Sequence, residues 1–113
     1  IRDYLHVMDL AEAHAAAVNQ LLQAKAPIEL TLNLGTGQGL SVLDVVSGFE
    51  EATGISIPYE VVERRPGDVP KLEACPKQAE AVLGWTAKRS LAEICRDGWA
   101  WQSANPNGYR GET

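Results

Sequence analysis

The sequence lacks the features that define several specialised protein classes. Its two cysteines, Cys75 and Cys95, are too far apart for a Cys-x-x-Cys redox or zinc motif and too few for a disulfide framework. We therefore expect both to be free thiols. No apolar run approaches the roughly 18 residues of a membrane span, and the first residues lack the pattern of a signal peptide. These absences favour a cytoplasmic protein without a membrane partner.

Basic residues are in the minority, with ten Lys and Arg against fifteen Asp and Glu and a formal net charge of −5. They are scattered along the chain, which argues against nucleic acid as a partner. The hydrophobic fraction of 45% and the charged fraction of 22% are typical of a globular domain. A chain of this size is expected to form one domain that buries roughly two-thirds of its unfolded surface.

Complete catalytic motifs are also missing. No lysine lies four residues after Tyr4, Tyr59 or Tyr109, so the Tyr-x-x-x-Lys acid/base pair is absent, and no nucleophile motif is present. His6 and His14 have no cysteine or carboxylate at ligand spacing, and we expect them to be core or edge histidines. The sequence thus predicts no catalytic residue and no metal site, and it favours a binding domain.

Capping signals and apolar residues at helical spacing predict four helices. The first is expected to begin at a capping box of Asp9 and Glu12, with an apolar face that packs on a sheet. Tryptophans at helical spacing usually anchor a core. The other expected features are a Ser41/Asp44 box and Gly54 for the second helix, Pro76–Leu83 and Gly84 for the third, a Ser90/Glu93 box for the fourth with Leu91, Ile94, Cys95 and Trp101 on its buried side, and core positions for Trp85, Trp99 and Trp101.

Three short segments have the composition of strands, namely 4–7, 30–34 and 57–62. Together with the helices they predict an α/β, α+β-like domain with a short mixed sheet of about three strands. We expect this domain to occupy residues 1–104. Residues 105–113 contain proline and two glycines and are expected to be a frayed tail.

A glycine-rich stretch, Gly35 to Gly39, follows one expected strand and precedes a helix. This position invites comparison with dinucleotide-binding turns. The spacing, however, is Gly-x-Gly-x-Gly instead of Gly-x-Gly-x-x-Gly, so the glycine needed for close packing of helix and strand is one position early. We interpret the stretch as a turn and expect no cofactor-binding residue in this chain.

Arg2, Arg65 and Asp68 are the candidate binding residues. Arg65 lies where an expected strand enters a loop, at the sheet edge where α/β folds place ligands. A guanidinium binds phosphate oxygens through two parallel hydrogen bonds, so two arginines can clamp a pyrophosphate, and an ionised aspartate suits a sugar hydroxyl. The alternative is a solvated ion pair between Arg65 and Asp68 worth under ~1 kcal/mol. The residues alone leave both interpretations open.

Several motifs, in order and in approximate spacing, resemble the UDP-glucose 4-epimerases of the extended short-chain dehydrogenase/reductase family. The resemblance covers nearly the whole chain and lies in 2–11, 33–42, 64–70, 83–85 and 99–109. It implies that this chain is the carboxy-terminal substrate domain. The amino-terminal half, which binds NAD and carries the Tyr-x-x-x-Lys pair, is then missing, so the chain alone is expected to be inactive.

The resemblance also implies roles for particular residues. Arginines matching Arg2 and Arg65 bind the diphosphate of UDP-glucose or UDP-galactose, and an aspartate matching Asp68 binds the ribose. Leu72 matches a position whose size influences the entry of N-acetylated sugars. One departure lies at Cys75, where the family commonly has an aspartate that caps the next helix, so a poorer cap is expected there.

Two alternatives remain open. The chain could be a stand-alone, non-catalytic module for nucleotide-sugar binding or interaction, or the equivalent domain of another nucleotide-sugar dehydratase or synthase. If instead it is a domain without its NAD-binding half, an apolar face is left uncovered. We then expect marginal stability or self-association through that face.

Overall fold

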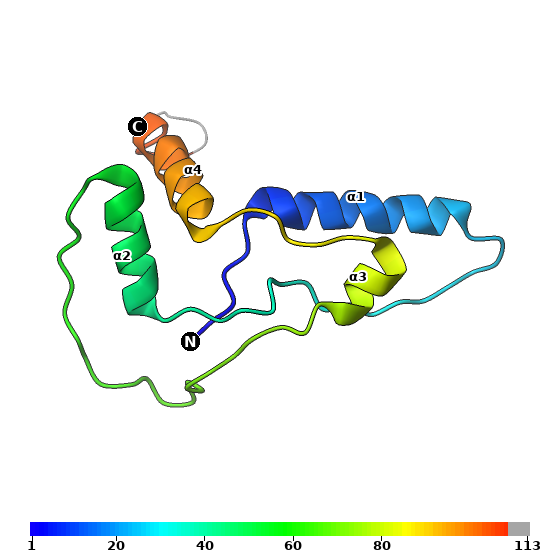
Figure 1. The fold of residues 1–113 in the computed structure, drawn as a ribbon, viewed down its shortest axis with the longest axis horizontal. Coiled ribbons are helices and arrows are strands. Elements are labelled where there is room, and N and C mark those ends of the chain that lie inside the picture. Colours follow the sequence, from blue (N-terminus) through cyan, green and yellow to red (C-terminus); the bar gives the residue numbers. More distant parts are fainter. Residues whose placement is uncertain (109–113) are drawn as a thin grey trace.

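The computed structural model describes residues 1–108, and within them it contains four helices and no strand (Figure 1). Most of the predicted tail, including Tyr109, lies outside the described residues. The predicted helices are thus all present, whereas the predicted sheet is not. The helices are α1 (Val7–Gln23), α2 (Val42–Thr53), α3 (Lys77–Leu83) and α4 (Leu91–Ala104).

The start and end of α2 are those predicted. The Ser41 hydroxyl accepts a hydrogen bond from the Asp44 backbone N–H at 3.0 Å, and the Asp44 carboxylate accepts one from the Ser41 N–H at 3.0 Å. This reciprocal pairing is a capping box, and its hydrogen bonds hold the pKa of Asp44 below the usual value. Gly54 ends the helix in the left-handed conformation.

The last two helices follow their predicted signals as well. Ser90 and Glu93 form a second capping box at the start of α4, and Gly84 ends α3 in the left-handed conformation. Pro76 precedes α3 and provides no side-chain hydrogen bond to the helix. The poorer cap was expected at Cys75, and the N-cap is instead Pro76, which likewise leaves this helix start without a side-chain cap.

The start of α1 differs from the prediction. Its N-cap is His6, whose Nδ1 accepts a hydrogen bond from the Met8 N–H at 2.9 Å. The Asp9 carboxylate instead accepts hydrogen bonds from the backbone of Lys88 and Arg89 and from the Arg89 guanidinium. The expected capping box of Asp9 and Glu12 was therefore wrong, because a partner almost eighty residues away takes the Asp9 carboxylate.

Two helix pairs make up the packing (Figure 1). In the pair of α2 and α4, the rings of Phe49 and Trp99 meet edge to face, with centroids 5.7 Å apart and an interplanar angle of 80°. In the pair of α1 and α3, the small side chains Ala13 and Ala79 pack with Trp85 in the buried core. The core is small because these few side chains carry most of it.

The tryptophans do not all have the predicted core position. Trp85 is 5% exposed, whereas Trp101 is 48% exposed and Trp99 packs on Phe49 at the surface. The prediction is therefore confirmed for Trp85 and wrong for Trp101.

Both cysteines are free, as predicted, with Cys75 exposed and Cys95 buried on α4.

The predicted sheet of about three strands is absent from the described residues. Arg2 forms an isolated bridge with Leu40 and another with Leu72. Neither bridge extends into a ladder within residues 1–108. A strand requires a neighbour that repeats its hydrogen bonds along the backbone, and strand-like composition does not supply that neighbour. The 57–62 segment illustrates this, because its Val61 is 82% exposed and, within residues 1–108, its backbone forms no hydrogen bond with the backbone of another segment. Its Ile57 N–H donates instead to the Glu50 side chain on α2.

The molecule is open for its length. Its radius of gyration is 17.3 Å, compared with about 13 Å for a compact chain of this size. Its accessible surface is 8570 Å², against about 6,100 Å² expected, so it buries about half of its unfolded surface instead of two-thirds. Within residues 1–108, no helix combines the length and the apolar character needed to cross a membrane.

The first nine residues connect the separate parts of the molecule. Their backbone and side chains bond to the glycine-rich stretch, to the loop before α3 and to α4. Without these bonds the two helix pairs would have few contacts with one another. The connections are Ile1 with Leu72, Arg2 with Leu40, Asp3 with Thr36 and Gly37, His6 with Asp97, and Asp9 with Arg89.

Candidate functional site

Arg2 is held by its backbone and its side chain. Its N–H and carbonyl bond to Leu40 at 2.9 and 2.7 Å, which fixes the residue beside the chain that enters α2. Its guanidinium Nη1 donates to the Ile1 carbonyl at 2.9 Å and to the Val69 carbonyl at 3.0 Å. The arginine predicted to bind phosphate is thus attached to the loop that precedes Leu72.

Arg65 and Asp68 lie on a tight turn in the same loop. The Asp68 N–H donates to the Arg65 carbonyl at 3.1 Å, and Gly67 adopts a φ of 85°, which favours glycine. The Arg65 Nε donates to the Asp68 carboxylate at 2.8 Å, while the Arg65 side chain is 83% exposed. This is the solvated ion pair between Arg65 and Asp68 that the sequence left open as the alternative to a phosphate clamp.

The two arginines contact neighbouring residues of this loop. Arg65 pairs with Asp68, and Arg2 donates to Val69, the next residue. Arg2 also lines a cavity of about 520 Å³ that does not include Arg65 or Asp68. The structure therefore brings the arginines to the same loop without placing them in one cavity. The cavity is lined by Arg2, Asp3, Asn33, Leu34, Leu72, Glu73, Ala74 and Cys75.

Leu72 belongs to this cavity and is 59% exposed. Its backbone N–H donates to the Ile1 carbonyl at 2.9 Å, next to Arg2. The expected specificity position and one expected phosphate ligand therefore lie side by side. A larger side chain at Leu72 would reduce the space beside the Arg2 guanidinium.

The glycine-rich stretch is bound by carboxylates. Asp3 accepts hydrogen bonds from the N–H groups of Thr36 and Gly37, each at 2.9 Å, and Glu73 accepts one from the Gly39 N–H at 2.8 Å. Burial raises the pKa of Asp3, but the hydrogen bonds from Thr36 and Gly37 outweigh it and lower the pKa below its usual value. The backbone donors that a dinucleotide phosphate would need are thus taken by anions.

Close packing explains one glycine of this stretch. A Cβ at Gly35 would lie 2.7 Å from the Cβ of Ala74 and 2.7 Å from the Asp3 carboxylate. No side chain fits there without displacing the cavity wall. Asp3 and Glu73 were not singled out in the sequence. Asp3 lies within the first motif that resembles the epimerases, whereas Glu73 lies outside the motifs.

The two histidines have structural surroundings. His6 is 5% exposed, and its Nε2 lies 2.8 Å from the Asp97 carboxylate while its Nδ1 caps α1. His14 is exposed, with its Nδ1 2.8 Å from the Leu10 carbonyl. The expected core position is thus found for His6, whereas His14 lies at the exposed surface of α1 instead of a core or edge position.

A second polar cluster lies between α1 and the segment that joins α3 to α4. Arg89 donates to Asp9 at 2.7 Å and to Glu12 at 3.0 Å, and the Trp85 Nε1 donates to the Asp9 carbonyl at 2.9 Å. Burial raises the pKa of Asp9, but the hydrogen bonds from Arg89 and Lys88 and the charge of Arg89 lower it overall. This cluster is internal and joins the first helix to the segment that leads into the last.

Sequence comparison finds relatives that cover almost the whole chain. A UDP-glucose 4-epimerase of Bacillus subtilis is 48% identical over 110 residues, which is 97% of this chain and 32% of the relative. UDP-glucose 4-epimerase GEPI42 of Cyamopsis tetragonoloba is 49% identical over 112 residues, 99% of this chain and 32% of the relative. No protein-family model matches the chain.

Solved structures agree with the sequence relatives. A UDP-glucose 4-epimerase from Stenotrophomonas maltophila with bound NAD and formylated UDP-arabinopyranose matches 90% of this chain and 30% of its own, at a TM-score of 0.84 and 46% identity. The UDP-glucose 4-epimerase from Bifidobacterium longum in complex with NAD+ and UDP matches 95% of this chain and 31% of its own. Its TM-score is 0.85 and its sequence identity is 40%. The motif resemblance is thereby confirmed, and the chain is homologous to the carboxy-terminal part of the UDP-glucose 4-epimerases, spanning about a third of their length.

Proposed function

We propose that this chain is the nucleotide-sugar-binding portion of a UDP-glucose 4-epimerase. In this proposal Arg2 and Arg65 bind the diphosphate of UDP-glucose or UDP-galactose, and Asp68 binds the ribose. The observation that carries it is the attachment of both arginines to the adjacent residues Asp68 and Val69. The identity of 48% to an epimerase over 97% of the chain supports the same assignment.

The clamp has a physical rationale in the donors that remain on each guanidinium. Arg65 uses Nε for Asp68, so its two Nη groups are the donors that we assign to phosphate. Binding a dianion at exposed guanidinium groups anchors the ligand at its charged end. The sugar then stays free to turn about the phosphate linkage, as interconversion at its carbon 4 requires.

We propose further that NAD binds outside the described residues of this chain. The glycine-rich stretch is the sole sequence candidate, and its N–H groups at Thr36, Gly37 and Gly39 already donate to Asp3 and Glu73. A dinucleotide phosphate would meet these two carboxylates. We therefore assign NAD, which the solved relatives contain, to polypeptide beyond this chain, and we expect the chain alone to show no epimerase activity.

A binding experiment tests the clamp directly. The chain is titrated with UDP and UDP-glucose by calorimetry, and Arg65→Ala is compared with Arg64→Ala, a neighbouring arginine with no assigned role. One charge-assisted hydrogen bond contributes about 1.5–3 kcal/mol, so Arg65→Ala is expected to weaken binding about tenfold or more. Equal affinities for Arg65→Ala and the unmodified chain would contradict the assignment.

A hybrid enzyme tests the catalytic context. The part of the Bacillus subtilis relative that precedes the matched region is joined to this chain, and conversion of UDP-galactose is followed with NAD. We expect turnover in the hybrid, none in the chain alone, and a strong loss in the Arg65→Ala hybrid. UDP-glucose binding without turnover in a folded hybrid would instead favour a non-catalytic binding module.

Substrate breadth is testable at Leu72 in the same hybrid. Leu72→Tyr is expected to lower turnover of UDP-N-acetylglucosamine more than that of UDP-glucose, because the side chain shares a cavity with Arg2. Equal effects on both substrates would remove Leu72 from the sugar site.

A cytoplasmic location stays a prediction from the sequence.

A further inference from the structure

The Asp3 carboxylate joins the first residues of the chain to the glycine-rich stretch. Its Oδ1 accepts hydrogen bonds from the Thr36 N–H at 2.9 Å and from the Thr36 hydroxyl at 2.7 Å. Its Oδ2 accepts one from the Gly37 N–H at 2.9 Å. Hydrogen bonds to an ionised acceptor are the stronger kind, and three of them fix both oxygens of this side chain. They thereby also fix the backbone that carries Arg2, the preceding residue.

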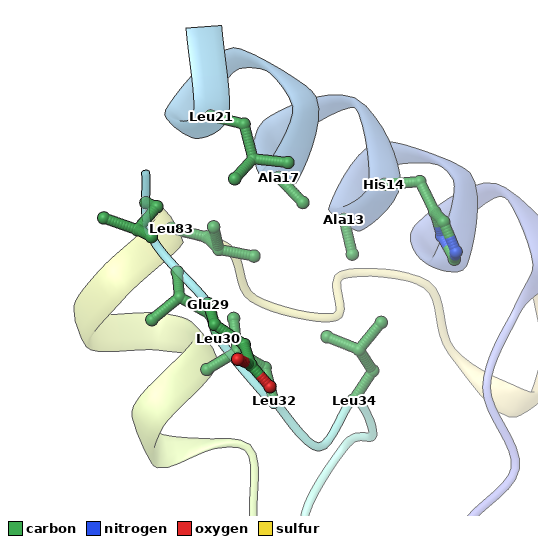
Figure 2. A pocket seen from close by; sticks show the side chains of 10 residues that line it. Ala13, His14, Ala17, Leu21, Glu29, Leu30, Leu32, Leu34 and Leu83 are labelled. Atoms are coloured by element: carbon green, nitrogen blue, oxygen red, sulfur yellow. The ribbon is translucent and has the colours of Figure 1, made fainter. Parts of the chain in front are cut away.

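The glycine-rich stretch is in turn attached to the buried core. Leu34, which directly precedes it, packs against that core, and its side chain points toward α1 (Figure 2). Gly35 is itself buried. The hydrogen bonds to Thr36 and Gly37 therefore connect Asp3 to a part of the chain whose position is set by packing.

The side chain of Arg2 has no comparable attachment. Among residues 1–108, its guanidinium donates hydrogen bonds to the carbonyls of Ile1 and Val69. Both of these residues lie at the surface, with exposed fractions of 46% and 48%. Its backbone pairs with Leu40, just beyond the glycine-rich stretch. The position of Arg2 relative to the core thus depends on this stretch and on Asp3, which binds it.

Asp3 and Arg2 also line the same cavity of about 520 Å³, together with Leu72. We propose that Asp3 is a positioning residue, whose hydrogen bonds to the glycine-rich stretch place the Arg2 guanidinium against the diphosphate of a nucleotide sugar. This inference rests on the proposed role of Arg2 in diphosphate binding. Asp3 acts through Arg2 and does not contact the phosphates, because two anions repel each other.

Two substitutions weaken the contact to different degrees. In Asp3→Asn an NH2 group replaces one acceptor oxygen, so the side chain can no longer accept hydrogen bonds from both Thr36 and Gly37 as the carboxylate does. Thr36→Val is milder, because it removes the hydroxyl that donates to Asp3 and keeps the backbone donors. We expect the same direction of effect from both substitutions and a smaller effect from Thr36→Val.

Asp44→Asn is the matched control. The Asp44 carboxylate also accepts a backbone hydrogen bond, from the Ser41 N–H at 3.0 Å, but Asp44 does not line the cavity that contains Arg2. This substitution therefore removes a carboxylate acceptor of the same kind at a helix start, away from the proposed site.

Steady-state kinetics of the Bacillus subtilis hybrid separate positioning from stability. A displaced guanidinium loses at least one charge-assisted hydrogen bond to the diphosphate, so Asp3→Asn is expected to raise KM for UDP-galactose about tenfold. The diphosphate is bound in the ground state and the transition state alike, so kcat is expected to change less than about twofold. A merely structural role would instead reduce the folded fraction and hence the apparent kcat, at unchanged KM. An unchanged KM in Asp3→Asn, or an equal rise in Asp44→Asn, would overturn the inference.

A double-mutant cycle tests whether Asp3 acts through Arg2. In an Arg2→Ala hybrid, Asp3→Asn is expected to raise KM little further, because the guanidinium that it positions is gone. In an Arg65→Ala hybrid, Asp3→Asn is expected to raise KM by its full factor. Equal factors in the two backgrounds would overturn the assignment of Asp3 to Arg2.

Hydrogen exchange tests the placement of Arg2 without any nucleotide sugar. The N–H groups of Arg2 and Leu40 each donate to the carbonyl of the other, at 2.9 and 2.7 Å. In the 113-residue chain, followed by NMR, Asp3→Asn is expected to speed exchange of these two amides by about tenfold or more, and Asp44→Asn is expected to leave it unchanged. A hybrid without turnover would count against the proposed function, whereas unchanged exchange in Asp3→Asn would overturn the role of Asp3 whether or not the hybrid is active.

Discussion

Replacing Asp9 with asparagine removes the charge from a fully buried carboxylate. Asp9 is 0% exposed and accepts hydrogen bonds from Lys88 and from the backbone and guanidinium of Arg89, at 2.7 to 3.3 Å. Removing one partner of a buried pair costs about 3–5 kcal/mol. Arg89 retains Glu12, so we expect a loss of about 3 kcal/mol, a large part of the roughly 5–15 kcal/mol that stabilises a domain.

Urea unfolding followed by tryptophan fluorescence measures this loss, because the Trp85 indole donates to the Asp9 carbonyl. Glu12→Gln is the control, since Glu12 contacts the same arginine from a more exposed position and its removal is expected to cost much less. If the two variants lose the same stability, the buried carboxylate does not hold α1 to the segment before α4 as we infer.

The pH dependence gives a second check on the same residue. The pKa of Asp9 is lowered in the folded chain from an ordinary value of 3.8. A lowered pKa means that the stabilisation is present above about pH 4 and is lost as the pH falls through the folded value. The stability difference between the unmodified chain and Asp9→Asn should therefore be equal at pH 7 and pH 5 and shrink in more acidic solution.

Three further predictions use other parts of the molecule. Gly98→Ala is expected to stabilise α4 by up to ~1 kcal/mol, because a Cβ there meets no atom within 4 Å. In Gly48→Ala the Cβ would lie 2.6 Å from the Leu91 side chain, which is expected to cancel or reverse that gain. Urea unfolding of the two variants compares their stabilities. Cys75 should react with a thiol reagent at once, and Cys95 only after unfolding, because it is buried and desolvation raises its pKa; equal rates would contradict the packing of α4. Sedimentation of the chain alone should show association that increases with concentration, and a strictly monomeric, high-melting chain would contradict the uncovered apolar surface.

The helices predicted from local signals are the part of the fold that the sequence determines best. Ser41 with Asp44 and Ser90 with Glu93 each close a capping box within four residues, and Gly54 ends its helix through its own backbone. Such signals depend on neighbours in the chain, so they can be read without the tertiary structure.

The errors came from interactions between distant residues. Asp9 and Glu12 have the spacing of a capping box, but Arg89 binds both carboxylates. The strand-like composition of 57–62 is real, yet a strand also depends on a partner that composition does not reveal. The buried fraction of the surface was also predicted wrongly. The fraction expected from chain length assumes a compact shape, which this chain lacks.

The residues of the candidate site stay a prediction from the sequence, and their geometry could not be predicted. Arginines suit a diphosphate by their chemistry, and motif resemblance selected Arg2 and Arg65. The contact of Arg2 with the Val69 carbonyl could not be predicted, because it joins residues 67 positions apart. The supporting carboxylates Asp3 and Glu73 were missed for the same reason.

The connections made by the first nine residues determine when this chain can fold during synthesis. These residues are translated before their partners Arg89 and Asp97, which lie 80 and 91 positions later in the sequence. The helices between them can form as they emerge, but the junctions wait until Arg89 and Asp97 have been translated. Contacts of such long sequence separation slow folding, so apolar segments of this region stay unpaired until then.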